Sequence, residues 1–321
     1  MKKMPKNTTQ KISLSASVTD ELSDKRLDQV ASVLFSQYSR TRLQSWIKNG
    51  ELTVDDKILR SKDKVQAGQV ILVNATLKSE GNGQAQDIKL DIVYEDQDII
   101  VINKPVGLVT HPAIGNRDNT LLNALLYHAP ELKNVPRAGI VHRLDKDTSG
   151  LLVVARNLEA HTHLTRELKN HEIEREYEAI VDGAMIAGGT IDKPIGRHPY
   201  KRTLMAVTEN GREAVTHYRV LERFPAHTHL KVQLETGRTH QIRVHLAHIG
   251  YPIVGDKTYG GRFKLPPGAT EKLKEALRNF PRQALHARSL TLEHPRTGNE
   301  VTFAAPLPKD MRDLLKLLRS T

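Results

Sequence analysis

Residues 138–155 read AGIVHRLDKDTSGLLVVA, in which a charged loop, HRLDKDTSG (residues 142–150), joins two short apolar segments. Both flanking segments, AGIV and LLVVA, predict buried strands because they are short, apolar and partly β-branched. Within the loop, Asp145 lies between Arg143 and Lys146. Nearby opposite charges favour the ionised form of a carboxyl group, so Asp145 is suited to act as a nucleophile or a general base. A structural ion pair within the loop is the alternative.

The surrounding residues 88–321 read as one α+β domain. Helices are predicted over residues 120–128 and 158–169, and the segments that predict strands are DIVY, DIIVINK, EREYEAIV, THYRV, HLKVQLE, SLTLEHP and VTFAAP. Several of these strands are separated by short turns, so we expect a mixed, mainly antiparallel β-sheet flanked by helices and loops. The sequence shows neither an internal repeat nor the glycine pattern of a Rossmann or P-loop nucleotide site.

Two further stretches carry chemically useful side chains. In EREYEAIV, Tyr177 is placed on a strand so that its ring points to one face of the sheet, with a buried core tyrosine as the alternative. GRTHQIRVH brings Arg238, His240 and Arg243 together after a strand, which is more hydrogen-bonding capacity than the start of a core helix needs. An arginine from this stretch can pair with Asp145 across a cleft through a bidentate contact.

His245 and His248, three residues apart, raise the alternative of a metal site. No HExxH pattern and no cysteine accompanies them. We therefore expect core or RNA-facing histidines here, and no metal.

Residues 20–75 read as a separate, small, helix-rich module. RLDQVASVL and RLQSWIKNG space their apolar residues along one helix face, and the short strands ELTV, KIL and GQVILV follow. On the second helix Arg40, Gln44 and Lys48 are four residues apart, with Arg42 close by. This spacing suits contact with successive phosphates, although a solvated helix face has the same pattern.

Composition narrows the class of protein. The net charge of +11 favours a polyanionic partner such as nucleic acid. There is no cysteine, which fits a reducing cytoplasm, and no apolar run of the roughly 20 residues that a membrane-spanning helix requires. We expect residues 1–19 to be a flexible tail and the polar residues 76–87 to be a linker.

Four stretches, GIVHRLDKDTSGLLVVARN, EREYEAIVDG, LETGRTHQIRVHLAHIGYPIVGD and QALHARSLTLEHP, together resemble the RluA-type pseudouridine synthases. The resemblance implies that Asp145 is the catalytic aspartate and that Arg143 takes part in base flipping. It also implies that Tyr177 stacks on the target uracil and that Arg243 pairs with the aspartate. Arg175 stands where many relatives have lysine, a change that keeps the charge.

The N-terminal module, from RLDQVASVL to GQVILV, resembles the S4 RNA-binding domain. That resemblance implies RNA contacts from Arg40, Arg42 and Lys48, and in the larger domain we expect further RNA contacts from Arg238 and His240. The partner implied is 23S rRNA in the large ribosomal subunit or a late precursor of it, with the helix 69 stem-loop as the target and other 23S sites as the alternative.

The implied reaction converts uridine into pseudouridine by breaking the N1–C1′ bond, turning the uracil and joining C5 to C1′. It needs no metal and no cofactor, and we expect a cytoplasmic monomer. Two other functions remain open at this point. One is a glycosidase that uses Asp145 and Asp147 as a carboxylate pair. The other is a non-catalytic RNA-binding protein that assists ribosome assembly.

Overall fold

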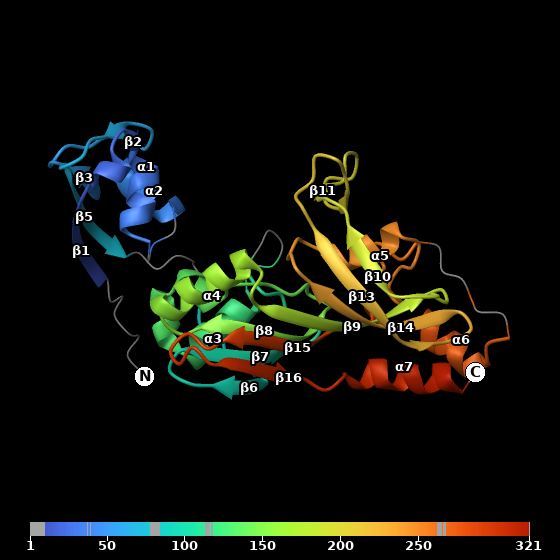
Figure 1. Cartoon of the computed structure of the whole chain (residues 1–321). Coiled ribbons are helices and arrows are strands. Elements are labelled where there is room, and N and C mark those ends of the chain that lie inside the picture. The colour runs from blue at the N-terminus through green and yellow to red at the C-terminus, as the bar shows by residue number, and fades with distance from the viewer. Residues whose placement is uncertain are drawn as a thin grey trace. The chain divides into compact units, whose positions relative to one another are not determined.

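A computed structural model describes residues 10–36, 38, 40–77, 84–112, 116, 118–261, 265 and 268–320. The chain divides into two compact units, Met1–Asn82 and Gly83–Thr321 (Figure 1). Each unit has hydrophobic clusters of its own. The predicted separation into a small N-terminal module and a larger domain agrees with this division.

The N-terminal unit packs two helices against short strands. In α1 (Leu27–Leu34) and α2 (Arg40–Asn49) the apolar residues predicted to face inward are buried, among them Leu27, Leu43 and Trp46. The remaining elements are β1 (Gln10–Ser17), a 3-10 helix (Asp20–Leu22), β2 (Lys25–Arg26), β3 (Leu52–Val54), β4 (Lys64–Val65) and β5 (Val70–Leu77). Strands β1, β5 and β3 form an antiparallel sheet in that order, and β2 pairs with β4.

Strand β1 corrects the prediction of a flexible tail for residues 10–17, and residues 1–9 of that predicted tail lie outside the described residues. Residues 10–17 pair with the whole length of β5, from Gln10 opposite Leu77 to Ser17 opposite Val70. Ile12 is buried in the core of the unit, and Leu14 packs against that core. The alternation of apolar and polar residues in QKISLSAS is the pattern of a half-buried strand.

The predicted linker, residues 76–87, is shorter in the structure. Strand β5 continues to Leu77. At the other end, the Gln84 carbonyl accepts a hydrogen bond from the Asn123 side chain, and the Gln86 N–H donates to the Asn123 carbonyl. Residues 78–83 of the predicted linker lie outside the described residues.

The larger unit is built on a nine-stranded sheet with the order β10-β13-β14-β9-β15-β8-β7-β6, and β16 pairs with β15. Every pairing is antiparallel except that of β15 with β8, so the predicted mixed, mainly antiparallel sheet is confirmed. The strands are β6 (Ile92–Glu95), β7 (Ile99–Lys104), β8 (Ser149–Ala155), β9 (Glu174–Asp182), β10 (Gly189–Asp192), β13 (Val215–Arg223), β14 (His227–Leu234), β15 (Leu285–Glu293) and β16 (Glu300–Ala304).

Helices flank this sheet, as Figure 1 shows for α4 and α7. The predictions for residues 120–128 and 158–169 are confirmed by α3 (Leu121–His128) and α4 (Leu158–Asn170). The other helical elements are α5 (Gln241–His248), α6 (Glu271–Arg278), α7 (Lys309–Arg319) and two 3-10 helices, η2 (Pro130–Asn134) and η3 (Pro136–Gly139). No helix in the described part of the chain combines the length and the apolar character needed to cross a membrane.

Strand β8 fixes the position of the loop with which it begins. All seven of its residues are buried. Leu152 and Val154 belong to one hydrophobic cluster, and Leu151 and Val153 belong to another, so alternate side chains enter the cores on opposite faces of the sheet. Both faces of this strand are covered, which explains why the run LLVVA is apolar at every position.

The strand predicted for AGIV (residues 138–141) is wrong. Ala138 and Gly139 belong to the 3-10 helix η3, and Ile140 makes only an isolated bridge to Val154. Gly139 has a φ of 79°, and a Cβ atom added there would lie 1.9 Å from the Ala155 carbonyl oxygen. At Gly139 the chain therefore turns closely against β8 and does not pair with it as a strand. The charged loop runs from this irregular turn into the central strand β8.

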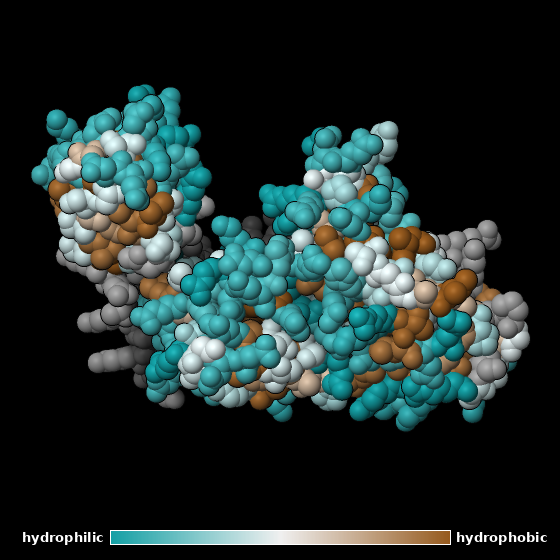
Figure 2. Space-filling model, viewed as in Figure 1, coloured by the Kyte–Doolittle hydropathy of each residue, from teal (hydrophilic) through white to brown (hydrophobic). Residues whose placement is uncertain are grey.

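A hairpin made of β11 (Ile195–Arg197) and β12 (Met205–Val207) projects from the larger unit (Figure 1). Its surface is mostly hydrophilic (Figure 2). Tyr200, near the tip, is almost fully exposed. The sequence did not predict this hairpin, because its strands are only three residues long.

Candidate active site

The loop that carries Asp145 is held by side chains from three other segments. The Thr110 hydroxyl donates to the Leu144 carbonyl at 2.8 Å, and the Gln283 amide donates to the Thr148 hydroxyl at 3.0 Å. These contacts fix the backbone on both sides of Asp145.

Lys104, at the end of β7, supplies the third anchor. Its side chain is fully buried, and its ammonium group donates to the carbonyls of Pro105, Leu108 and Lys146 at 2.9 to 3.1 Å. Burial lowers the pKa of Lys104 to about 8, although Asp145 and Asp147 oppose that shift. The sequence analysis did not single out Lys104, because its partners are backbone atoms that no side-chain pattern reveals.

Asp145 meets Arg243 across the pocket, as predicted. Arg243 Nη1 donates to Asp145 Oδ2 at 3.0 Å. The predicted bidentate geometry, however, belongs to a different partner. Arg243 Nε and Nη2 both bind Asp256, at 2.7 and 2.9 Å. Asp145 therefore receives one hydrogen bond from a guanidinium group whose orientation is set by Asp256.

Asp256 is itself fully engaged. Its Oδ1 atom also accepts from the backbone N–H groups of Thr258 and Tyr259. Burial opposes ionisation of Asp256, but Arg243 outweighs burial and lowers the pKa of this carboxyl. The pKa of Arg243 is raised, because Asp256 and then Asp145 outweigh the opposing effect of burial. The sequence analysis missed Asp256, although the residue ends the quoted stretch GYPIVGD, because its contact with Arg243 appears only in three dimensions.

Asp145 lines a pocket of about 320 Å³. This volume is near the lower end of the range for ligand sites. Arg143, predicted to lie beside Asp145, is exposed and contributes to the wall. The other charged or titratable residues of the wall are Lys146, Asp147, His240, Arg243, Lys257 and Arg282. Basic side chains dominate the wall, which suits a phosphate-containing ligand.

Tyr177 is buried in the core of the larger unit. It is 5% exposed and sits on β9 between Val232 of β14 and Ala287 of β15. Burial raises its pKa, and the Asp145 carboxylate adds to that shift. Its ring therefore lies in the electrostatic neighbourhood of Asp145 but does not contribute to the pocket wall.

His240 and Arg238 lie where α5 begins. His240 Nε2 is 3.9 Å from Asp145 Oδ1, and its Nδ1 is 2.7 Å from the Tyr259 hydroxyl. Arg238 donates to the Glu213 carbonyl at 2.8 Å. Of the two residues, only His240 lines the pocket.

The histidines considered as metal ligands have other roles. Both ring nitrogens of His245 are engaged at 2.9 Å, one with the Thr216 hydroxyl and one with the Lys193 carbonyl. His245 is therefore a core histidine with satisfied ring nitrogens, and His248 is exposed.

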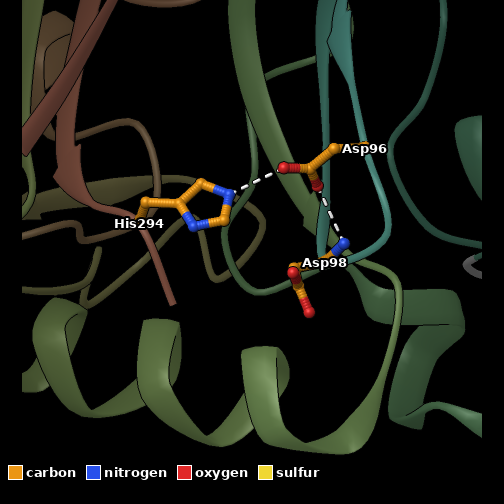
Figure 3. Close-up of side chains that lie close together, drawn as sticks. All are labelled: Asp96, Asp98 and His294. Atoms are coloured by element: carbon orange, nitrogen blue, oxygen red, sulfur yellow. Dashed lines mark hydrogen bonds and ion pairs between the residues drawn. The ribbon is translucent and has the colours of Figure 1, made fainter. Parts of the chain in front are cut away.

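Asp96, Asp98 and His294 also combine residue types that bind metals (Figure 3). Asp96 accepts from His294 at 2.7 Å, from the Tyr94 hydroxyl and from two backbone N–H groups. Asp98 accepts from Arg296 and from Asn157. Because these oxygens already have donors, the cluster locks the turn between β6 and β7 to the end of β15.

In the N-terminal unit, the basic face of α2 surrounds a buried carboxylate. Arg40 and Gln44 both donate to Asp28 Oδ2, at 2.8 and 2.9 Å, and Arg26 binds both oxygens at 3.1 Å. Arg42 is largely buried, whereas Lys48 is exposed. Of the three predicted RNA-contacting residues, Arg40 thus also holds the fold together.

Comparisons with known proteins agree with this architecture. Residues 25–71 match the S4 domain, and residues 98–248 match the RNA pseudouridylate synthase family. The chain is 59% identical over 308 residues to ribosomal large subunit pseudouridine synthase D of Pseudomonas aeruginosa, with 96% of each protein covered. The chain belongs to the RNA pseudouridylate synthase family. It is therefore an RNA pseudouridine synthase, and neither a glycosidase nor a non-catalytic binding protein.

Other members of the family are similar over the same length. The proteins of the same description from Vibrio cholerae and Escherichia coli K12 are 55% and 53% identical, over 96% and 97% of this chain and 95% and 96% of theirs. Among solved structures, human RNA pseudouridylate synthase domain containing 4 superimposes with a TM-score of 0.56 at 27% identity, covering 71% of this chain and 92% of that one. The larger unit therefore has the pseudouridine synthase fold, preceded by an S4 domain.

Proposed function

We propose that this enzyme isomerises uridines in 23S rRNA of the large ribosomal subunit, with the helix 69 stem-loop as its target. The names of the similar bacterial proteins support a large-subunit rRNA substrate. The S4 domain and the net charge of +11 support binding to RNA. Another site in the same 23S rRNA is the alternative target.

The observation that carries the proposal is the incomplete hydrogen bonding of Asp145. Arg243 holds its Oδ2 atom, whereas Oδ1 faces His240 at 3.9 Å, beyond hydrogen-bond distance. The carboxylate is thus held by a cation at one oxygen and offers the other oxygen to the pocket. Such a group can react with the ribose of a bound nucleotide.

Two chemical routes are open to Asp145. It can attack C1′, forming an ester with the sugar as N1 leaves, or it can remove the proton from C2′ as the N1–C1′ bond breaks. In both routes the freed uracil turns within the pocket and C5 bonds to C1′. In the first route this step displaces the aspartate from C1′, and in the second Asp145 returns the proton to C2′. The C5 proton is then lost while N1 gains one. Product and substrate are isomers, so the reaction consumes no external reactant, and we propose that it uses no cofactor and no metal.

Base flipping brings the uridine to Asp145. Extruding a base from a stem or loop costs a few kcal/mol. We propose that Arg143, exposed at the pocket wall, enters the space that the nucleotide leaves. Stacking of the uracil on Tyr177 requires the base to reach deeper than the pocket wall, since the ring is buried. Stacking on an aromatic ring offsets about 1 to 3 kcal/mol.

The remaining contacts with RNA come from basic residues. In the S4 domain we propose phosphate contacts from Arg40, Arg42 and Lys48, of which Arg40 and Lys48 are exposed and Arg42 is largely buried. In the larger unit we propose contacts from Arg238 and from His240 at the pocket. We also propose that the enzyme acts as a monomer in the cytoplasm, where ribosomal subunits are assembled.

The test maps pseudouridines in large-subunit rRNA from cells that lack the protein and carry either the wild type or Asp145→Asn. Wild type should restore modification in helix 69, and Asp145→Asn should not. Restoration at another 23S site only would reject helix 69 as the target. Restoration by both proteins would reject Asp145 as the reacting group. Asp55→Asn, a change on an exposed turn of the S4 domain, is the control and should behave as wild type.

A further inference from the structure

His240 is held in an unusual conformation beside Asp145. Its φ is 57°, in the left-handed region that non-glycine residues rarely adopt, and it occupies the N-cap position of α5 without capping the helix through its side chain. Strained residues of this kind persist where the surrounding structure holds them, and they are frequent at functional sites. Here the backbone conformation accompanies an imidazole ring placed at the pocket wall.

Tyr259 is the hydrogen-bond partner of one nitrogen of the imidazole ring. The Met205 N–H donates to the Tyr259 hydroxyl oxygen at 3.1 Å, so the hydroxyl hydrogen is available for His240 Nδ1 at 2.7 Å. The ring of Tyr259 is held in turn by the Arg243 guanidinium group, 5.0 Å from its centroid. With Nδ1 as acceptor, the neutral imidazole carries its hydrogen on Nε2, and burial favours that neutral form by lowering the pKa of His240.

The Nε2–H group and Asp145 Oδ1 therefore face one small space from two sides, 3.9 Å apart. One side offers a hydrogen-bond donor and the other an acceptor. A single hydroxyl oxygen placed roughly 2.7 to 3.0 Å from each atom can accept from His240 and donate to Asp145. A ring oxygen or a carbonyl oxygen can only accept, so neither satisfies both atoms.

We propose that His240 is a specificity-determining residue that recognises the 2′-hydroxyl of the target nucleotide. This inference rests on the proposed function of Asp145, because a carboxylate that acts at C1′ or C2′ lies next to the substituents of those two carbons. The 2′-hydroxyl is the group there that both donates and accepts. The sugar oxygen O4′ loses electron density as C1′ becomes positive, and the uracil oxygens move when the base turns. The 2′-hydroxyl distinguishes RNA from DNA, so His240 makes the reaction selective for ribose.

A chemical double-mutant cycle tests this contact. The full-length protein and His240→Ala are each given a synthetic stem-loop whose target nucleotide is uridine or 2′-deoxyuridine, all other nucleotides being ribonucleotides. Single-turnover rates and RNA affinities are measured for the four combinations. Loss of the 2′-hydroxyl also changes the intrinsic reactivity of the sugar. That change is the same for wild type and His240→Ala, so it cancels when the rate ratios of the two proteins are compared.

For each protein, the single-turnover rate on the uridine substrate is divided by the rate on the 2′-deoxyuridine substrate. We expect this ratio to be about 10-fold larger for wild type than for His240→Ala, which corresponds to one hydrogen bond. Tyr259→Phe, which removes the hydroxyl that fixes the ring and keeps the aromatic volume, should reduce the same discrimination in part. His248→Ala, on the exposed side of the same helix, should leave it unchanged. An equal deoxy penalty in wild type and His240→Ala would overturn the inference, whereas a wild type inactive on the all-ribose RNA would instead refute the proposed function.

Discussion

Asp28 in the S4 domain and Asp145 in the catalytic unit both pair with arginine, but they differ in how many hydrogen bonds they accept. Asp28 is fully buried, and its two oxygens accept from Arg26, Arg40 and Gln44. Asp145 is 16% exposed and accepts one side-chain hydrogen bond, from Arg243. The same pair of residue types thus stabilises a domain in one place and leaves an oxygen without a hydrogen bond from the described residues in the other.

The difference separates carboxylates that hold the fold from Asp145, which we propose as the reacting carboxylate. Asp256 behaves like Asp28, since Arg243 and two backbone N–H groups occupy it. By holding the bidentate side of the guanidinium, Asp256 also limits Arg243 to one contact with Asp145. Asp28 and Asp256 each accept four hydrogen bonds, which leaves them little capacity for a further partner, whereas Asp145 accepts one side-chain hydrogen bond from the described residues.

The largest effect on stability is expected from Arg243→Gln. Loss of the guanidinium group leaves both Asp145 and the buried Asp256 without their cation. The protein should be destabilised by roughly 3 kcal/mol, and the single-turnover rate should fall at least about 10³-fold. Denaturant unfolding and single-turnover kinetics measure the two effects.

Arg40→Gln is the matched control. Asp28 keeps Arg26 and Gln44 after this change, and Arg40 is half-exposed, so stability should fall by less than about 1 kcal/mol. The single-turnover rate of bound RNA should not change, although binding should weaken because Arg40 is a proposed phosphate contact. Equal losses of stability and rate in Arg243→Gln and Arg40→Gln would show that the Arg243–Asp145 and Arg40–Asp28 pairs have the same role.

Asp28→Asn should destabilise the S4 domain by about 2 kcal/mol, because asparagine cannot accept hydrogen bonds from all three partners. The chain has one tryptophan, Trp46, which is buried in α2, so its fluorescence reports unfolding of this domain. The urea midpoint read from Trp46 should fall in Asp28→Asn and stay unchanged in Asp145→Asn. If the midpoint shifted in Asp145→Asn and not in Asp28→Asn, Asp145 and not Asp28 would be the residue that stabilises the S4 domain.

Asp28 should also make the stability of the S4 domain depend on pH. Burial opposes ionisation of Asp28, but hydrogen bonds from Arg40, Gln44 and Arg26 outweigh it and lower its pKa to about 2. Since the ordinary value is 3.8, the stability that Asp28 contributes is fully present above about pH 4 and is lost as the pH falls toward 2. Urea unfolding followed by Trp46 fluorescence should show this loss in wild type, and the difference between wild type and Asp28→Asn should disappear near pH 2.

The smallest effect is expected from Lys48→Ala. Lys48 is exposed on α2, so its loss should remove about one phosphate contact and weaken RNA binding about threefold without changing the bound single-turnover rate. Plotted as log affinity against log salt concentration, the slope should decrease in magnitude by about 1. An unchanged slope would place the RNA away from this face of α2.

The sequence was most informative where the pattern was periodic or charged. It predicted the helices at residues 120–128 and 158–169, the mainly antiparallel sheet and the meeting of Asp145 with Arg243. It failed at AGIV, since an apolar tetrapeptide does not reveal that Gly139 turns against β8. It also treated residues 10–17 as a tail although their alternation signals a strand.

The sequence could not show the parts of the site that are formed by residues far apart along the chain. Asp256 and Lys104 come from segments far from residue 145 along the chain. Asp256 binds the Arg243 side chain and two backbone N–H groups, and Lys104 donates to three backbone carbonyls. The burial of Tyr177 likewise depends on the two strands that enclose it. Such contacts depend on tertiary packing, which local pattern does not determine.

The most direct test of the central claim compares Asp145→Asn with wild type on large-subunit rRNA labelled with tritium at C5 of uridine. Joining C5 to C1′ releases that tritium to water. If the unfilled oxygen of Asp145 reacts, Asp145→Asn should bind the RNA as wild type does and release tritium about 10⁴-fold more slowly. Release by a folded, RNA-binding Asp145→Asn at a rate near that of wild type would contradict the account.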